Sequence, residues 1–197
     1  MRELEHEIDI IARAIEGDEN AYRSLLNSYK PRIFSYVYRT IRNYHDAEDI
    51  TLDTFVRCFK SLKSFDRSKK FSTWIYTIAH NLTIDFLRKN KKNYENIDDR
   101  EIESLEIADT KSKRPAEEYE KQEKLSKIEQ ALSQLPAIDR EIVILFHKEE
   151  KSYQEISEIL KIPETTIKTH LHRARLRIKE MVKWLRHETF GIFLRIT

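Results

Sequence analysis

Cations and aromatic side chains alternate between Arg57 and Lys92. This stretch holds ten Lys or Arg residues against two Asp residues. Its aromatic residues include Phe65, Phe71, Trp74 and Tyr76. Cationic side chains can follow a phosphate backbone, and exposed aromatic rings can stack on bases or wedge between them. The pattern therefore predicts a surface that binds single-stranded nucleic acid.

Helical periodicity divides these side chains between a core and a surface. Phe71 and Trp74 lie on an apolar stripe with i, i+3, i+4 spacing, which favours core packing over base contact. Tyr76 lies off that stripe and is the better candidate for a contact with DNA. His80 and Asn81 also face away from the stripe, and an asparagine side chain can pair with a base edge. We expect these three side chains to be exposed.

A second motif lies near the end of the chain. The sequence "SYQEISEILKIPETTIKTHLHRARLRIKE", residues 152–180, has the short helix, tight turn and longer helix of a helix-turn-helix. In such a unit the second helix enters the major groove of DNA, where its N-terminal half meets base edges. Residues 165–186 hold seven Lys or Arg residues and one acid. The pattern predicts binding to duplex DNA, and the alternative is a three-helix bundle with a basic, solvated face.

The sequence predicts no catalytic, metal or cofactor site. It has no paired catalytic carboxylates, nucleophile with an adjacent base, Gly-rich phosphate loop or cluster of metal ligands. His170 and His172 are two residues apart, a spacing that points their side chains to different sides of a helix. A zinc site is therefore not expected, and the chain is not expected to be an enzyme.

The composition favours a helical protein of one or two domains. The chain has 197 residues, of which 40% are hydrophobic and 36% charged, with 2 Gly and 4 Pro. A lone cysteine, Cys58, excludes an internal disulfide framework. The longest run of large apolar residues, "IVILF" at 142–146, is too short to cross a bilayer, and the N-terminus lacks the layout of a signal peptide. We expect a cytoplasmic protein that does not insert into a membrane.

The expected fold is all-α, with two small helical domains joined by a flexible linker. The first domain covers residues 1–93 and contains helices over 18–42, 47–62 and from 71 onward, with Asp18 and Asp46 as N-caps, a bend or break at Pro31 and a loop over 63–70. An acidic linker covers 94–116, with a short helix over 99–107 as the alternative. The second domain, 117–186, contains the helix-turn-helix and helices over 117–134, 138–148, 153–160 and 164–186. Ser152 and Glu155 fit a capping box at the start of the 153–160 helix, and the inner face of the last helix is expected at Ile167, Leu171, Ala174, Ile178, Met181 and Leu185. An apolar tail, 187–197, either packs on the last helix or contacts a partner.

Two long segments resemble bacterial RNA polymerase sigma factors of the extracytoplasmic-function (ECF) group. "DAEDITLDTFVRCFKSLKSFDRSKKFSTWIYTIAHNLTIDFLRK" resembles sigma region 2, and "LPAIDREIVILFHKEEKSYQEISEILKIPETTIKTHLHRARLRIKE" resembles region 4. The two motifs occur in the family's order, with no region 3 domain between them. The resemblance implies a factor that binds core RNA polymerase, recognises −35 and −10 promoter elements and helps to melt DNA.

The resemblance also implies roles for individual residues. Contacts with core polymerase are expected from the helix "DAEDITLDTF", at Asp46, Glu48, Asp49, Leu52 and Asp53, with Leu52 where the family usually has Gln. Contacts with the −10 element are expected at Phe65, Lys69, Lys70, Ser72, Tyr76, His80, Asn81, Asp85 and Arg88. Contacts with the −35 element are expected at Thr165, Thr166, Lys168, Thr169, His172, Arg173 and Arg175, the last to phosphate.

The expected partners are core RNA polymerase, promoter DNA and an anti-sigma factor, which in this family is often at the membrane. The −35 element would be bound as duplex and the −10 element as single strand. The alternative function is a stand-alone helix-turn-helix regulator whose N-terminal domain senses a ligand or dimerises. Promoter-specific initiation with core polymerase separates the two functions, because only a sigma factor would support it.

Overall fold

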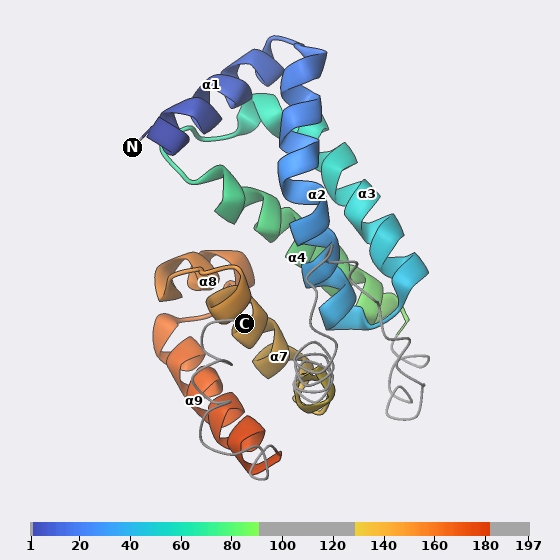
Figure 1. Cartoon of the computed structure of the whole chain (residues 1–197), viewed down its shortest axis with the longest axis vertical. Helices are drawn as coiled ribbons and strands as arrows, with labels where there is room; N and C mark the ends of the chain where they lie inside the picture. Colours follow the sequence, from blue (N-terminus) through green and yellow to red (C-terminus); the bar gives the residue numbers. More distant parts are fainter. Residues whose placement is uncertain (1, 91–128, 182–197) are drawn as a thin grey trace, which may run out of the picture.

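The computed structural model describes residues 2–90 and 129–181 (Figure 1). This part of the chain is all-α, as predicted, and contains no strand. The N-terminal half contains α1 (Arg2–Ile15), α2 (Glu19–Ile41), α3 (Tyr44–Ser61), the 3₁₀ turn η1 (Leu62–Ser64) and α4 (Phe71–Lys89). The C-terminal half contains a short helical stretch over 129–133, then α7 (Ala137–Val143), the π-helix η3 (Ile144–Lys148), α8 (Tyr153–Leu160) and α9 (Glu164–Met181). The predicted linker, 94–116, and tail, 187–197, lie outside the described residues.

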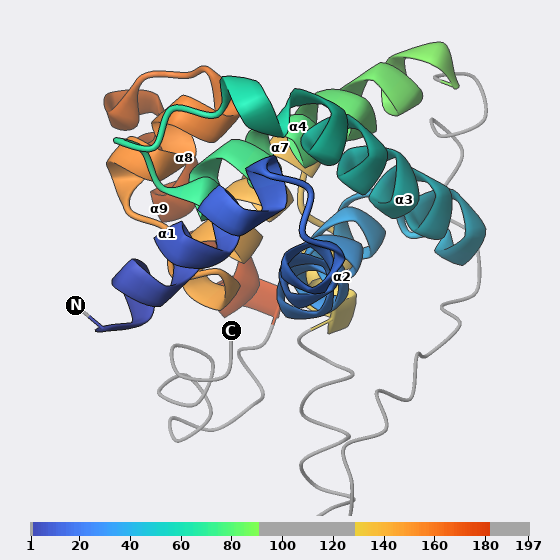
Figure 2. The ribbon, with the colours of Figure 1, turned by 90° about the horizontal axis from the view of Figure 1, so that it is seen from above.

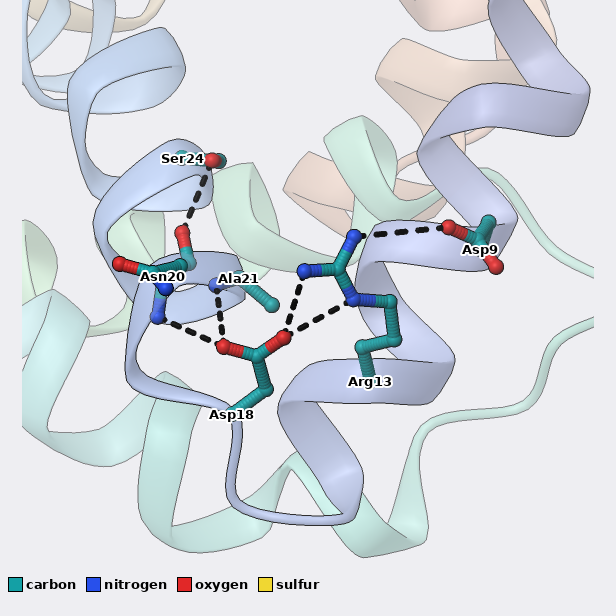
Figure 3. A network of polar contacts seen from close by, with 6 residues as sticks. All are labelled: Asp9, Arg13, Asp18, Asn20, Ala21 and Ser24. Carbon is teal, nitrogen blue, oxygen red and sulfur yellow. Dashed lines mark hydrogen bonds and ion pairs between the residues drawn. The ribbon is translucent and has the colours of Figure 1, made fainter.

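Asp18 starts α2, as the sequence predicts. Its Oδ1 accepts hydrogen bonds from the backbone N–H of Asn20 at 2.8 Å and of Ala21 at 3.4 Å (Figure 3). Its Oδ2 pairs with Arg13 of α1, and this bond contributes most to a lowered pKa of Asp18. The Asp18 carboxylate therefore caps α2 and, through Arg13, also fixes the angle between α1 and α2. The helix then continues through Pro31 without the expected break.

The start of α3 corrects a predicted cap. Asn43 has an extended backbone and its side chain accepts from the backbone N–H of Asp46 at 3.0 Å, so Asn43 is the N-cap. Asp46 lies in the first helical turn, where an acid interacts favourably with the helix dipole. Asn and Asp side chains can both accept from the free N–H groups at a helix start. The sequence pattern alone favoured Asp46, three positions after the actual cap at Asn43.

Helices α2, α3 and α4 pack together, with α1 across α2, and form the core of the N-terminal half (Figure 1). The apolar stripe of α4 is buried as predicted: Phe71 and Ile75 have almost no exposed surface. The rings of Phe65, Phe71 and Trp74 lie within 5.1–5.7 Å of one another, in tilted or edge-on contacts. Phe71 is therefore a core residue, and Trp74 is partly buried against the same core.

The helix-turn-helix forms at the predicted place. The side chain of Ser152 accepts from the backbone N–H of Glu155, whose side chain accepts in turn from the N–H of Ser152, which is the predicted capping box. Lys161 ends α8 in the left-handed conformation with φ 59°. The inner face of α9 is buried at the predicted spacing, at Ile167, Leu171, Ala174 and Ile178.

The two halves pack directly against each other. Helix α4 lies along α8, and α2 contacts α7 and η3 (Figures 1 and 2). Buried side chains of both halves belong to one core cluster. The sequence carried no prediction of this relative orientation. The relative orientation of the two halves decides which of the candidate DNA-binding side chains are exposed.

The capping box gives a stability test. Ser152→Ala removes the acceptor for the N–H of Glu155 and should lower the free energy of unfolding by about 1 kcal/mol. Ser152→Thr keeps the hydroxyl and should stay close to the parent protein. Urea unfolding followed by circular dichroism measures both. An equal loss in the two variants would argue against the cap as the cause.

Candidate nucleic-acid and polymerase interface

The predicted polymerase-binding residues form an exposed row on α3. Asp49, Leu52 and Asp53 are exposed, and Asp46 and Glu48 are partly buried at the start of the helix. Leu52 is 47% exposed and Val56, one turn further on, is 49% exposed. The opposite side of α3 is buried against the core through Ile50, Thr54 and Cys58. The row thus combines two carboxylates with two large apolar side chains that are about half exposed.

The loop before α4 presents its cations but not its aromatic ring. Lys69 and Lys70 are exposed, as the predicted −10 contacts require. Phe65 is only 8% exposed, because its ring packs on Phe71 and Trp74. The expectation that the Phe65 ring is exposed is therefore wrong, and its contact with the −10 element stays a prediction. An isolated aromatic residue in a polar loop can anchor the loop to the core, and here it does.

Tyr76 and His80 also differ from the expectation. Both lie off the apolar stripe of α4, as predicted, but Tyr76 has no exposed surface and His80 has 9%. The C-terminal half covers them: the Tyr76 hydroxyl donates to Glu149, and His80 Nδ1 lies 2.6 Å from Glu141 Oε1. In a sequence, a polar helix face indicates contact with solvent. In the structure, this polar face of α4 contacts the C-terminal half.

The end of α4 matches the expectation better. Asn81 and Arg88 are exposed and Asp85 is partly buried. Arg88 Nη2 donates to Asp85 Oδ1 at 2.9 Å, an i, i+3 pair on the solvent side. A pair of this kind contributes little to stability, so the guanidinium can exchange it for a phosphate or a base at small cost. These three side chains are available to DNA without a change in the fold.

Two buried carboxylates that the predictions missed organise the interface between the halves. Glu141 accepts from the Tyr36 hydroxyl and contacts His80. Glu149 accepts from the Tyr76 hydroxyl and from Arg32, whose Nε and Nη2 both lie 3.0 Å from Glu149 Oε2. Burial, reinforced by these carboxylates, raises the pKa of both tyrosines, so their hydroxyls remain donors.

The sequence contained an indication that Glu141 is buried and has a polar partner. Glu141 occupies the apolar stripe of its helix, three residues after Ile138 and four before Leu145. A carboxylate on a core-facing stripe needs a buried partner, because an unpaired buried charge is very unfavourable. Glu149 follows the helix end and carried no such signal.

The contacts continue to the start of α8. Lys151 Nζ donates to Ser72 Oγ at 2.6 Å, and Lys70 Nζ lies 3.2 Å from Glu155 Oε1. Burial raises the pKa of Glu155, but hydrogen bonds from Ser152 and Lys70 outweigh it and lower the pKa to about 2. Four predicted −10 residues, Lys70, Ser72, Tyr76 and His80, therefore each contact a residue between Glu141 and Glu155.

Helix α9 exposes most of the predicted −35 residues. Thr165, Lys168, Thr169, His172 and Arg173 are exposed, and Thr166 is partly buried. Lys168 Nζ lies 5.3 Å from the centre of the Tyr153 ring, which holds the start of α9 to α8 through a cation–π contact.

Asp139 is a further residue that the sequence analysis did not identify. Its side chain is 3% exposed and lies against α9, where it contacts His170 Nδ1. Arg177 Nη1 lies 3.5 Å from Asp139 Oδ2, and Arg173 Nη2 lies 3.9 Å from Oδ1. Arg173 Nη2 also lies 2.9 Å from His170 Nδ1. One buried carboxylate thus draws two half-exposed arginines and a histidine of α9 together.

Arg175 is held by its own domain. Its guanidinium lies over the Phe146 ring at 5.5 Å, and Nη2 lies 3.4 Å from His147 Nε2. Burial and the nearby Arg175 charge lower the pKa of His147 to about 4. A neutral His147 ring can accept a hydrogen bond from Arg175, and a protonated ring would repel it.

The depressed pKa of His147 predicts acid sensitivity. Between about pH 6.5, the usual histidine pKa, and about pH 4, the unfolded chain binds a proton at His147 that the folded chain does not. The stability that comes from neutral His147 should therefore be lost as the pH falls through this window. Urea midpoints of the parent and of His147→Gln, measured from pH 7 to pH 4, should converge or cross, because the variant lacks this loss. Parallel pH profiles would contradict the assignment.

Comparison with known proteins places both halves in one family. Residues 25–93 match the family model of sigma-70 region 2, and residues 125–178 match sigma-70 region 4. The ECF RNA polymerase sigma factor SigW of Bacillus subtilis (strain 168) is 36% identical over 181 residues, covering 88% of this chain and 95% of SigW. SigM of the same organism, also an ECF sigma factor, is 34% identical over 153 residues, covering 78% of this chain and 90% of SigM.

A solved structure agrees with these matches. The sigma factor RpoE in complex with the anti-sigma factor NepR from Bartonella quintana superposes with a TM-score of 0.65 at 26% identity, covering 82% of this chain and 96% of that one. The chain therefore belongs to the ECF family of RNA polymerase sigma factors, and its function is to direct promoter-specific initiation of transcription.

Proposed function

We propose that the two halves divide the work of a sigma factor between three surfaces of this chain. The exposed row of α3 docks on core polymerase, the polar face of α4 holds the separated −10 strand, and the N-terminal half of α9 reads the −35 duplex. The observation that carries the proposal is the exposed row Asp49, Leu52, Asp53 and Val56 within the region 2 match. A regulator that acts alone would have no use for such a row beside a region 4 helix-turn-helix.

Docking through α3 combines burial and charge. Leu52 and Val56 are one turn apart and present a small apolar patch beside the carboxylates of Asp49 and Asp53. Burying a leucine or valine side chain contributes about 1.5–3 kcal/mol, and flanking charges steer the partner and fix its register. The complementary surface on polymerase should therefore be apolar at its centre and basic at its edge.

Recognition of −10 DNA uses side chains in two different states. Asn81, Arg88 and the loop lysines are exposed, whereas Tyr76 and His80 are covered by the C-terminal half. Stacking of a base on an aromatic ring contributes about 1–3 kcal/mol in single-strand binding. Tyr76 can make that contribution only after the two halves separate.

Reading of −35 DNA centres on Arg173. An arginine can make a bidentate contact with guanine, and such a contact discriminates against other bases by about 1–3 kcal/mol. Asp139 lies behind Arg173 in the interior of the C-terminal half and limits the orientations of its guanidinium. We infer that Asp139 is a positioning residue for base reading. Arg175, held further round the helix by Phe146 and His147, suits a phosphate contact.

The remaining parts of the proposal concern chemistry, partners and location. We infer that the chain is not an enzyme and that bond formation belongs to polymerase. Among the described residues, no group of three or more His, Cys, Asp or Glu side chains could hold a metal ion. None of the described helices has both the length and the apolar character to span a bilayer. We propose that the chain acts in the cytoplasm and has an anti-sigma factor as a partner, as the similar RpoE structure has NepR.

Run-off transcription with core polymerase tests the function and the docking surface together. The parent chain should support promoter-specific transcripts. Asp49→Lys with Asp53→Lys should reduce core binding and transcript yield by tenfold or more, because favourable charge contacts become repulsive. The matched control is Glu16→Lys with Glu158→Lys, which makes the same charge change at exposed acids outside α3. Equal losses in both double variants would remove α3 as the docking site.

Base discrimination tests the role of Asp139. Asp139→Asn should lower discrimination at one −35 position by about threefold to tenfold, a part of the 1–3 kcal/mol that a bidentate arginine contributes. The measurement is binding to duplexes with single-base changes in −35. In an Arg173→Ala background the same substitution should have no further effect on discrimination, since the two residues act as a unit. A uniform loss over all sequences would make Asp139 a stability residue only.

A further inference from the structure

Part of the predicted −10 surface is occupied in this structure by the chain itself. Lys70 lies 3.2 Å from Glu155, and His80 lies 2.6 Å from Glu141. Tyr76 donates to Glu149, and Ser72 accepts from Lys151 at 2.6 Å. The covering segment is residues 141–155, which contains the end of α7, η3 and the start of α8. We call this segment the region 4 cover.

The chemistry of the cover resembles that of the DNA strand it would exclude. Three carboxylates, Glu141, Glu149 and Glu155, accept from a histidine, a tyrosine and a lysine of α4 and its preceding loop. Phosphate oxygens and base-edge acceptors would use the same donors in a bound strand. The buried Tyr76 hydroxyl and His80 Nδ1 each offer one proton, so the cover and the −10 strand compete for these two donors.

The cover is selective. The docking row of α3 and the reading face of α9, at Lys168, Thr169, His172 and Arg173, stay exposed while Tyr76 and His80 of the −10 face are hidden. A closed chain can therefore still meet polymerase through α3 and duplex DNA through α9. The step that closure prevents is the capture of a separated strand.

We propose that the region 4 cover is an intramolecular inhibitor of −10 strand binding, and that promoter opening requires the release of Glu141 and Glu149 from α2 and α4. This inference rests on the proposed role of α4 in holding the −10 strand. The closed population lowers the apparent affinity for single-stranded DNA by the fraction of chains that are open. A partner that binds the exposed surfaces and favours separation of the halves would raise that fraction.

A thiol placed under the cover measures opening without DNA. Ser72→Cys is close to isosteric, and the parent chain, whose only cysteine is the buried Cys58, gives the background rate. Adding Glu141→Gln and Glu149→Gln to Ser72→Cys should speed reaction with a disulfide reagent by about tenfold, because charge-assisted bonds across the interface are lost. The matched control adds Glu150→Gln and Glu158→Gln, which change the net charge equally at exposed positions. Equal thiol reaction rates in the Glu141→Gln, Glu149→Gln chain and in the control chain would contradict the proposal that the region 4 cover is an inhibitor.

Binding of single-stranded DNA then tests competition. The probe is a fluorescein-labelled pool of 12-nucleotide single strands, followed by anisotropy, with Ser72 intact. The Glu141→Gln, Glu149→Gln chain should bind about tenfold more tightly than the control double variant, in proportion to the open fraction. Circular dichroism must show equal helix content. Faster thiol reaction without tighter binding would mean that the covered face is not a DNA site.

The proposed function of the three surfaces and the proposed inhibition by the region 4 cover can be contradicted independently. If the parent chain gives no promoter-specific run-off transcript, the proposed use of the surfaces fails whatever the thiol rates are. If run-off succeeds but the thiol rate does not respond to Glu141 and Glu149, the surfaces stand and the cover is overturned. Tyr76→Phe gives an independent check, because it removes the hydroxyl that donates to Glu149 while keeping a ring for stacking. It should raise the thiol rate and preserve single-strand binding, and an unchanged thiol rate would contradict the cover.

Discussion

The buried carboxylate of Glu149 joins the two halves of the molecule through contacts with α2 and α4. It lies 2% exposed between Arg32 of α2 and the Tyr76 hydroxyl of α4, and it comes from the C-terminal half. A buried carboxylate is tolerated only when donors surround it, so Glu149 fixes how α2, α4 and the C-terminal half meet. The burial of Tyr76 on α4 follows from that requirement.

The backbone around Glu149 is shaped to present this side chain. The chain leaves α7 through the π-helix η3, where the N–H of Glu149 bonds to the carbonyl of Ile144 at 3.1 Å. Glu150 then takes the left-handed conformation with φ 51°, and the N–H of Lys151 returns to the carbonyl of Leu145 at 2.9 Å. Such π turns often occur at functional sites because they re-aim side chains. Here Glu149 and Lys151 turn inward and Glu150 turns to solvent.

The sequence predicted the local structure well because local structure depends on neighbouring residues. The cap at Asp18, the capping box at Ser152 and the buried stripe of α9 are all confirmed. The state of Tyr76 and His80 was not predictable in this way, since their partners lie 73 and 61 residues further along the chain. Periodicity identifies the side of a helix that leaves its own core, but it does not distinguish solvent from a second domain. Only the acid on the α7 stripe, Glu141, indicated that a buried polar partner was needed.

The polar part of this interface can be specific and can still open. When the halves separate, the carboxylates, tyrosine hydroxyls and lysine regain hydrogen bonds to water, so the net loss is much smaller than the gross strength of the contacts. An apolar interface of equal area would regain nothing and would hold the halves shut. The donors that Glu141 and Glu149 occupy are also those that a DNA strand can satisfy, so the strand replaces the lost contacts as it binds. The acceptors of the strand thus replace the carboxylates of Glu141 and Glu149 on the same donors. Opening of the protein and binding of the strand are therefore coupled.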